Sequence, residues 1–168
     1  VKELELDEVV DILQNLPEER MEKILSSMSM VDRQRIEMGL IFPDNTAGGL
    51  LNTDVISVRP SNSIDEVIIY LRGQNELPEN TDKIFVVNDL NEYLGELSIS
   101  KIITSDPSLT VKEIMETDIL PIDVKVDDKE VATIFERNDL ISSPVIDQNK
   151  KLIGRITIDD VVDVIRED

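Results

Sequence analysis

The stretch VVNDLNEYLGELSISKII (Val86–Ile103) occurs again further along the chain as VIDQNKKLIGRITIDDVV (Val145–Val162). The two copies align without a gap, so that Gly95 corresponds to Gly154. A duplicated unit of this size commonly buries its apolar face against its copy, and the pocket between the copies is a natural place for a ligand. The repeat therefore favours a regulatory or binding module over an enzyme.

Shorter matches upstream extend each copy into a unit of strand, helix, strand, strand and helix. Asp54-Val-Ile in the first unit matches Asp118-Ile-Leu in the second, and the first unit carries a five-residue insertion around Glu76–Asp82. Mixed short strands with helices packed on them predict an α+β or α/β fold. We expect strands at 55–58, 84–87, 93–99, 120–124, 144–146 and 152–158, and helices beginning near 63, 100, 127 and 159.

The chain before the repeats divides into a helical segment and a linker. Residues 1–42 carry apolar stripes at helical spacing and predict three short helices. The linker, 43–53, contains Gly48-Gly49, which permits positive φ angles or a close backbone approach. A phosphate-binding P-loop would need Lys and Ser or Thr after its glycines, but Leu50-Leu51 stand there, so a structural role is favoured.

Composition excludes several classes of function. The chain has 168 residues with 36 acidic and 17 basic side chains, a formal net charge of −19, and neither Cys nor His. This charge disfavours binding to nucleic acid and favours cationic partners, although plain solubility is an alternative explanation. The absence of Cys and His removes disulfides, thiol nucleophiles, imidazole bases and the usual zinc ligands. A cytoplasmic, reducing location is the default expectation, and the missing initiator Met suggests an excised fragment.

The repeated motifs resemble a pair of CBS domains. The strongest marks are the strand Ser143–Asp147, the turn Gly154–Asp160 into the last helix, and its earlier copy Gly95–Lys101. Together with the helical segment and Phe42-Pro-Asp-Asn-Thr-Ala-Gly-Gly-Leu-Leu, they look like the cytoplasmic part of an MgtE-type magnesium transporter. The resemblance implies a tandem CBS pair preceded by a short all-helical segment: 1–42 the end of an N domain, 43–53 a linker, 54–106 the first CBS domain, and 107–168 the second with the start of a connecting helix.

The resemblance also implies a function. In that family the cytoplasmic part is a homodimer at the cytoplasmic face of the cell membrane, joined to the membrane domain of the same full-length chain. Bound Mg²⁺ holds its parts together and keeps the pore shut. Carried over to this sequence, the metal ligands are six aspartates: Asp7, Asp11, Asp127, Asp139, Asp160 and Asp163. Lys129 stands where the family often has an acid, so the sequence departs from the family pattern close to Asp127.

The chemistry of these aspartates is compatible with magnesium. Asp7 and Asp11 are four residues apart and Asp160 and Asp163 three apart, so each pair occupies one helix face. Two carboxylates about 4 Å apart repel by roughly 4 kcal/mol at an effective dielectric near 20, unless a dication lies between them. Mg²⁺ takes oxygen ligands and retains water, so few carboxylates suffice. The alternative is that aspartates at helix starts, such as Asp127 and Asp160, only cap their helices.

Two other functions remain open. CBS pairs commonly bind adenine nucleotides such as ATP between the units, with the Asp of a Gly-x-x-Ser/Thr-x-x-Asp motif on the ribose. Thr157 and Asp160 satisfy that pattern, whereas Lys101 replaces the Asp in the first unit. The module would then be a nucleotide sensor from another protein. A carboxylate-based hydrolase is the third alternative, and nothing beyond the acidic residues supports it.

Overall fold

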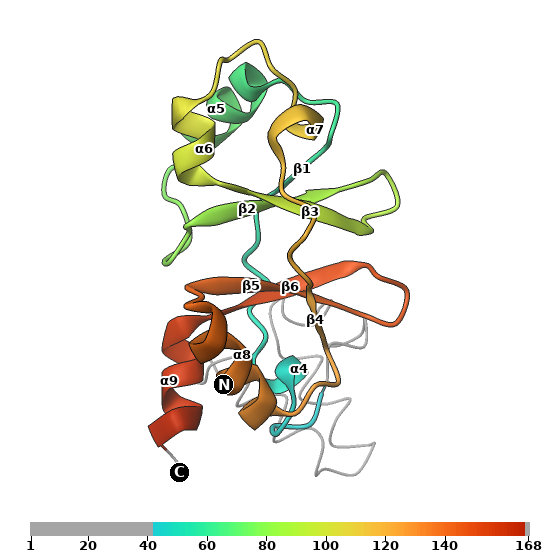
Figure 1. The fold of residues 1–168 in the computed structure, drawn as a ribbon, viewed down its shortest axis with the longest axis vertical. Coiled ribbons are helices and arrows are strands. Elements are labelled where there is room, and N and C mark those ends of the chain that lie inside the picture. The colour runs from blue at the N-terminus through green and yellow to red at the C-terminus, as the bar shows by residue number, and fades with distance from the viewer. Residues whose placement is uncertain (1–41, 167–168) are drawn as a thin grey trace, which may run out of the picture.

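Two three-stranded sheets stacked face to face form the centre of the molecule (Figure 1). The structure is a computed structural model that describes residues 42–166, and the helices predicted before them, with Asp7 and Asp11, lie outside the described residues. In each sheet the first strand is parallel to the second, and the second is antiparallel to the third. The first sheet contains β1 (Ser57–Val58), β2 (Lys83–Val87) and β3 (Tyr93–Ser98), and the second β4 (Ile122–Asp123), β5 (Ser142–Ile146) and β6 (Leu152–Thr157).

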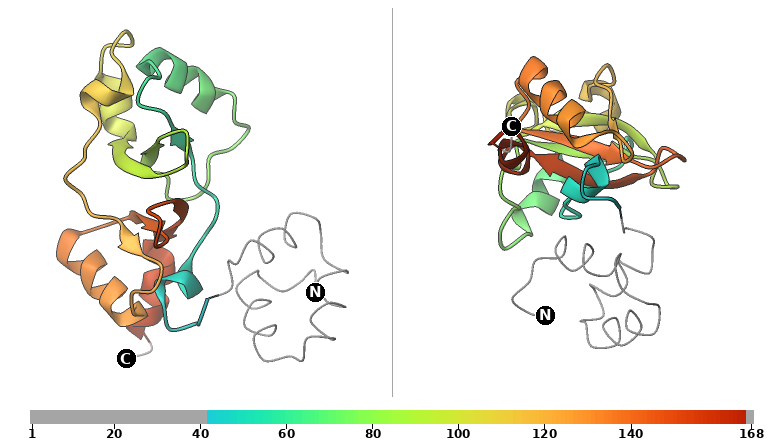
Figure 2. Two further views of the ribbon diagram at one scale, coloured as in Figure 1. Left: turned by 90° about the vertical axis from the view of Figure 1, so that its right-hand side faces the viewer. Right: turned by 90° about the horizontal axis from the view of Figure 1, so that it is seen from below.

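Helices cover the outer face of each sheet, so the molecule has four layers with helices at its two ends (Figures 1 and 2). The first sheet carries α5 (Ile64–Arg72), α6 (Ile99–Thr104) and α7 (Val111–Ile114), and the second carries α4 (Ala47–Leu50), α8 (Asp128–Asn138) and α9 (Ile158–Arg166). The predicted α+β fold of two tandem units is confirmed. The sequence repeat is also visible in the strand irregularities, because a register shift follows Val86 in one hairpin and Val145 in the other.

Local sequence explains where the helices begin. The Ser63 hydroxyl accepts a hydrogen bond from the Glu66 backbone N–H, and the Glu66 carboxylate accepts one from the Ser63 backbone N–H. This capping box satisfies two backbone donors that the first turn of α5 leaves without partners. The apolar face that follows, as predicted, packs through Ile64 and Val67 against the first sheet. Asp127 and Ser98 cap α8 and α6 more simply, because each side chain accepts one hydrogen bond from a backbone N–H of the first turn.

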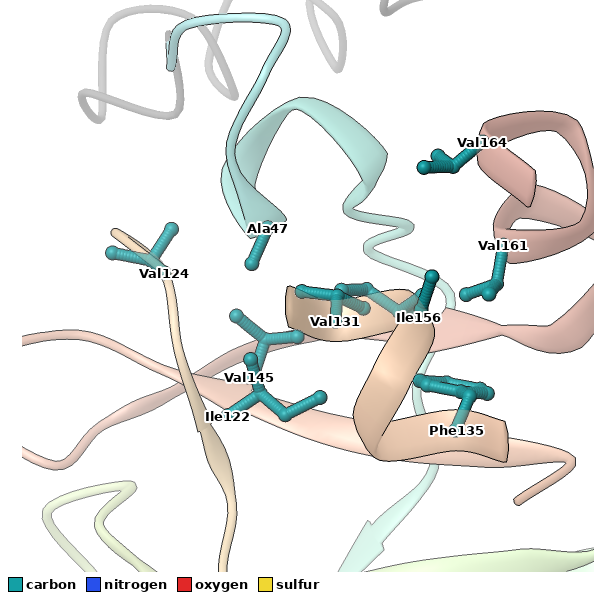
Figure 3. Packing of buried hydrophobic residues seen from close by; sticks show 10 residues of the cluster. Ala47, Ile122, Val124, Val131, Phe135, Val145, Ile156, Val161 and Val164 are labelled. Carbon is teal, nitrogen blue, oxygen red and sulfur yellow. The ribbon is translucent and has the colours of Figure 1, made fainter. Parts of the chain in front are cut away.

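The hydrophobic core of each unit is completed by a segment from outside its own repeat. α4 precedes the first repeat, yet Ala47 is fully buried in the core of the second unit (Figure 3). Its backbone N–H donates to the carbonyl of Val126 at 2.7 Å. Conversely, Val111 of α7 precedes the strands of the second repeat but is buried in the core of the first unit. The predicted boundaries at 53/54 and 106/107 divide the sequence repeats, whereas the packing crosses both.

Gly95 and Gly154 allow these crossing segments to pass. An added Cβ at Gly154 would lie 2.5 Å from the carbonyl oxygen of Asn52, and one at Gly95 would lie 2.4 Å from that of Glu116. These are closer than any ordinary carbon–oxygen contact, so only glycine fits. The same two segments pair with the strands, Asn52 with Arg155 and Glu116 with Glu96. Figure 2 shows them running between the units on opposite sides of the molecule.

The inner faces of the sheets meet across a small apolar cluster. Phe85, Val87 and Leu152 are buried there, with Val55 and Tyr93 packed against them. The hairpin turns add backbone hydrogen bonds, since the Tyr93 N–H donates to the carbonyl of Lys150 at 2.9 Å. The strands β3, β5 and β6 also carry buried polar or charged residues, which form the candidate sites: Glu96, Ser142, Ser143, Arg155 and Thr157.

Candidate functional site: the Thr157–Asp160 motif and the carboxylates of the second unit

The motif Thr157–Asp160 forms the junction between β6 and α9. The buried Thr157 hydroxyl hydrogen-bonds with the carboxylate of Asp159 and lies 3.2 Å from Oδ2 of Asp160. Val161 and Val164 fix the orientation of α9 because they are buried in the core of the second unit. The predicted motif residues are therefore brought together at one helix start, on the side of the unit that faces the first repeat.

Asp160 and Asp163 lie one turn apart on α9. Asp160 is half-buried beside Thr157, and Asp163 is exposed. At this spacing two side chains occupy the same helix face, so both carboxylates are available to one ion together with water. The pair fits the oxygen chemistry of Mg²⁺, but further ligands must come from another element.

Asp127 and Asp139 have structural roles at the two ends of α8. The Asp127 carboxylate accepts a hydrogen bond from the Lys129 N–H as the N-cap, which is the alternative considered from the sequence. Asp139 ends the helix in the left-handed conformation, with a φ of 52°, which Asp tolerates better than most residues. At 1.5 Å rise per residue, they are roughly 18 Å apart. These two aspartates cannot bind the same ion.

The remaining two predicted ligands, Asp7 and Asp11, lie outside the described residues. Within residues 42–166, no group of three or more His, Cys, Asp or Glu side chains is arranged to hold a metal ion. The described part of the chain thus presents two carboxylates one turn apart on α9, those of Asp160 and Asp163, but no complete coordination shell. Whether Asp7 and Asp11 complete it stays a prediction.

Arg155 is a functional candidate that the sequence analysis missed. Its side chain enters the space between the units, and the residue is only 3% exposed. The guanidinium donates to three backbone carbonyls, those of Asp54 at 3.0 Å, Asn80 at 2.9 Å and Glu79 at 2.5 Å. Two of these carbonyls belong to the five-residue insertion of the first repeat. The sequence contained a signal for this role, because Arg155 is a charged residue within a predicted strand, at a position that faces the buried layer between the sheets.

The charges around Arg155 explain how a guanidinium can be buried there. Burial lowers the pKa of Arg155, and four carboxylates oppose that effect: Asp82, Asp54, Asp159 and Asp160. A buried cation surrounded by acids is far less costly than an isolated one. The neighbourhood of the motif is therefore an acidic site with a built-in counter-ion.

The equivalent site of the first unit has different chemistry. Glu96 occupies the place of Arg155 and forms a buried ion pair with Lys83, the Nζ–Oε2 distance being 2.7 Å. Ser98 caps α6 by accepting from the N–H of Lys101, which stands where the second unit has Asp160. Burial, with a smaller effect from Glu96, raises the pKa of Tyr93 beside this pair. The two pseudo-equivalent sites are thus not interchangeable.

The comparisons with known proteins agree with this architecture. Residues 1–45 match the family model of the MgtE intracellular N domain, and residues 47–107 and 111–167 each match that of the CBS domain. The crystal structure of the cytosolic domain of the Mg²⁺ channel MgtE in complex with ATP has a TM-score of 0.83 and 30% sequence identity, covering 97% of this chain and 67% of that chain. This chain belongs to the MgtE family. It contains the end of the MgtE N domain followed by a CBS pair.

Curated MgtE relatives are longer than this chain. The magnesium transporter MgtE of Bacillus subtilis is 26% identical over 165 residues, which are 98% of this chain and 37% of that protein. The MgtE of Thermus thermophilus is 30% identical over 163 residues, 95% of this chain and 36% of that protein. The chain therefore spans little more than a third of either relative. Within residues 42–166 no helix is long and apolar enough to cross a membrane.

Proposed function

We propose that this chain is the magnesium-sensing regulatory part of an MgtE-family transporter, without catalytic activity of its own. The observation that carries the proposal is the MgtE N domain and CBS pair in one chain, ending in a helix that presents Asp160 and Asp163 one turn apart. Mg²⁺ would join these two carboxylates to Asp7 and Asp11 of the N domain, with Asp127 and Asp139 near separate ions. The transporter would be a homodimer through its CBS domains at the cytoplasmic face of the membrane, gating transport by its own membrane domain.

The mechanism follows from like-charge repulsion. Bringing the N-domain carboxylates against those of α9 costs roughly 4 kcal/mol for each close pair, unless a dication neutralises them. Mg²⁺ ions that bind only the compact arrangement therefore stabilise it by mass action. Sites that retain water and use few carboxylates bind weakly, which suits the sensing of an abundant ion.

Thermal melting and X-ray scattering test this proposal. Millimolar Mg²⁺ should raise the melting temperature and reduce the scattering radius, and the double substitution Asp7→Ala with Asp160→Ala should reduce both responses. Asp65→Asn is a matched control, because Asp65 is exposed in the first turn of α5 and belongs to no predicted site. Equal melting curves in Mg²⁺ and in chelator at matched ionic strength would refute magnesium sensing. If Na⁺ at equal ionic strength changed the melting temperature and the scattering radius as much as Mg²⁺ does, charge screening alone would explain the response.

An adenine-nucleotide sensor is the second candidate. The contact of Thr157 with Asp160 supports it, as does the ATP complex of the related MgtE cytosolic domain. In this chain, ATP or another adenine nucleotide would place its ribose against Asp160 of the second unit. Calorimetric titration with ATP tests the idea, and loss of the heat signal in Asp160→Asn is the expected result. Unchanged binding by that variant would rule out this motif as the ribose site.

A further inference from the structure

The insertion of the first repeat lies against the Thr157–Asp160 motif of the second. Besides the hydrogen bonds from Arg155 to the carbonyls of Glu79 and Asn80, the Asn80 side-chain amide donates to the Asp159 carboxylate at 3.1 Å. At the end of the insertion, the Ser142 hydroxyl donates to Asp82 at 2.6 Å. The segment 74–82, which contains the five-residue insertion, is thus held at several points along one side of the Thr157–Asp160 junction.

This arrangement exists at one of the two pseudo-equivalent sites. In the second repeat the link between α8 and β5 is residues 139–141, whereas the link between α5 and β2 is residues 73–82. The link 139–141 in the second repeat is too short to form a similar cover. The first unit also lacks the cation that would hold one, because Glu96 replaces Arg155 and is paired with Lys83.

We propose that residues 74–82 are a self-supplied cover of the Thr157–Asp160 motif, latched by Arg155, and that a nucleotide must release this latch to bind. The proposal rests on the nucleotide-sensing alternative above. A guanidinium bonds a phosphate through paired charged hydrogen bonds, which are stronger than those to neutral carbonyls. The phosphate of an adenine nucleotide therefore competes for the donors that hold Glu79 and Asn80. The apparent affinity for the nucleotide is the intrinsic affinity multiplied by the fraction of molecules whose cover is open, so a closed cover lowers it.

Limited proteolysis of the 168-residue chain with a glutamate-specific protease tests the latch without any ligand. The carbonyl of Glu79 belongs to the bond this protease would cut, and Arg155 holds it in place. Arg155→Met should speed cleavage after Glu79 by about tenfold or more, since one charged hydrogen bond corresponds to at least that factor. Arg137→Met, the same change at an exposed position of α8, is the matched control. Equal cleavage rates in Arg155→Met and the unchanged chain would overturn the latch.

A second variant, Asn80→Asp, tests the latch if Arg155→Met does not fold. Asn80 has a φ of 58°, and Asp tolerates this conformation, so Asn80→Asp keeps the turn but replaces the donor to Asp159 with a repelling carboxylate. It should speed cleavage after Glu79 while leaving the melting temperature close to that of the unchanged chain. A cover that stays protected in this variant, with the fold intact, would contradict the proposal.

The addition of AMP or ATP separates the cover from the nucleotide function. Nucleotide that binds by calorimetry should increase cleavage after Glu79 in the unchanged chain, and Asn80→Asp should bind it more tightly. Binding without any increase in cleavage would show that the cover does not gate the site. If neither the unchanged chain nor Asn80→Asp binds nucleotide, the nucleotide function fails, and the proteolysis comparison alone decides whether Arg155 latches the segment.

Discussion

Arg155 and Glu96 show how one residue changes the chemistry of a repeated site. They occupy equivalent places in β6 and β3, and both are buried in the layer between the sheets. Arg155 donates to the backbone carbonyls of Asp54 and of the insertion, whereas Glu96 pairs with Lys83 through Oε2 and has its other oxygen, Oε1, buried without a hydrogen-bond partner. A buried charge is tolerated when partners surround it and is costly when one partner is removed. Arg155 therefore ties its sheet to the insertion, whereas the Glu96–Lys83 pair joins two strands of one sheet.

The ion pair gives a prediction at this scale. Lys83→Met should destabilise the chain by about 3 kcal/mol or more, because Glu96 is left buried without its cation. The double change Lys83→Met with Glu96→Leu should recover most of that loss. Urea denaturation measures both free energies of unfolding. If the double variant were as unstable as Lys83→Met, the loss would come from removing the ion pair itself. It would then not come from leaving Glu96 buried without a cation, and the prediction would be wrong.

The two crossing glycines give a second prediction for single residues. Gly154→Ala and Gly95→Ala should each cost about 2–3 kcal/mol, since the added methyl group would overlap a backbone oxygen that cannot move without breaking strand pairing. Gly73→Ala is the control, because its nearest atom is 3.3 Å away, on the carbonyl of Tyr70. Thermal unfolding checks the comparison. Similar losses in all three variants would contradict the crossing-segment explanation.

The start of helix α5 is specified by its own sequence. Its capping box lowers the pKa of Glu66, chiefly through the hydrogen bond from the Ser63 backbone and then through the Ser63 side chain. A carboxyl group whose pKa is lower in the folded state stabilises the fold above the ordinary glutamate pKa of about 4.3. That contribution is lost as the pH falls through the lower, folded-state value.

The capping box can be tested by substitution and by pH. Ser63→Ala should cost about 1 kcal/mol at neutral pH, the usual loss for an N-cap. Glu66→Gln should remove part of the loss of stability seen between neutral and acidic pH, because the amide no longer titrates. Melting curves recorded from about pH 7 down to about pH 3, a range that spans the ordinary glutamate pKa, provide the measurement. An unchanged pH dependence in Glu66→Gln would show that this carboxylate does not contribute.

For the whole molecule, the exchanged segments make the two units mutually dependent. Residues 109–115 complete the first core, and residues 47–51 complete the second. A fragment of residues 54–116 should therefore show more protected amides by NMR than one of residues 54–106, which lacks α7 and Val111. If the two fragments were equally ordered, the exchanged segment would contribute nothing to the first core.

Much of this fold could be predicted from the sequence, because it depends on local pattern. The duplicated stretch located both hairpins, and Ser63 and the apolar spacing after it located α5. The exchange of α4 and α7 could not be predicted, since burial of Ala47 and Val111 depends on partners in the other repeat. The path of the insertion was missed for the same reason. Of the predicted site residues, the structure brings Thr157 and Asp160 together and separates Asp127 from Asp139.

The crossed connections also determine the order in which the chain can mature during synthesis. The first unit cannot close its interior when its own strands leave the ribosome, because it must wait for residues 109–115 to follow. The second unit depends instead on residues 47–51, which emerged long before and stay uncovered until β6 and α9 arrive. Neither half therefore matures independently of the other, and the nascent protein exposes the apolar residues of this segment until β6 and α9 have been made.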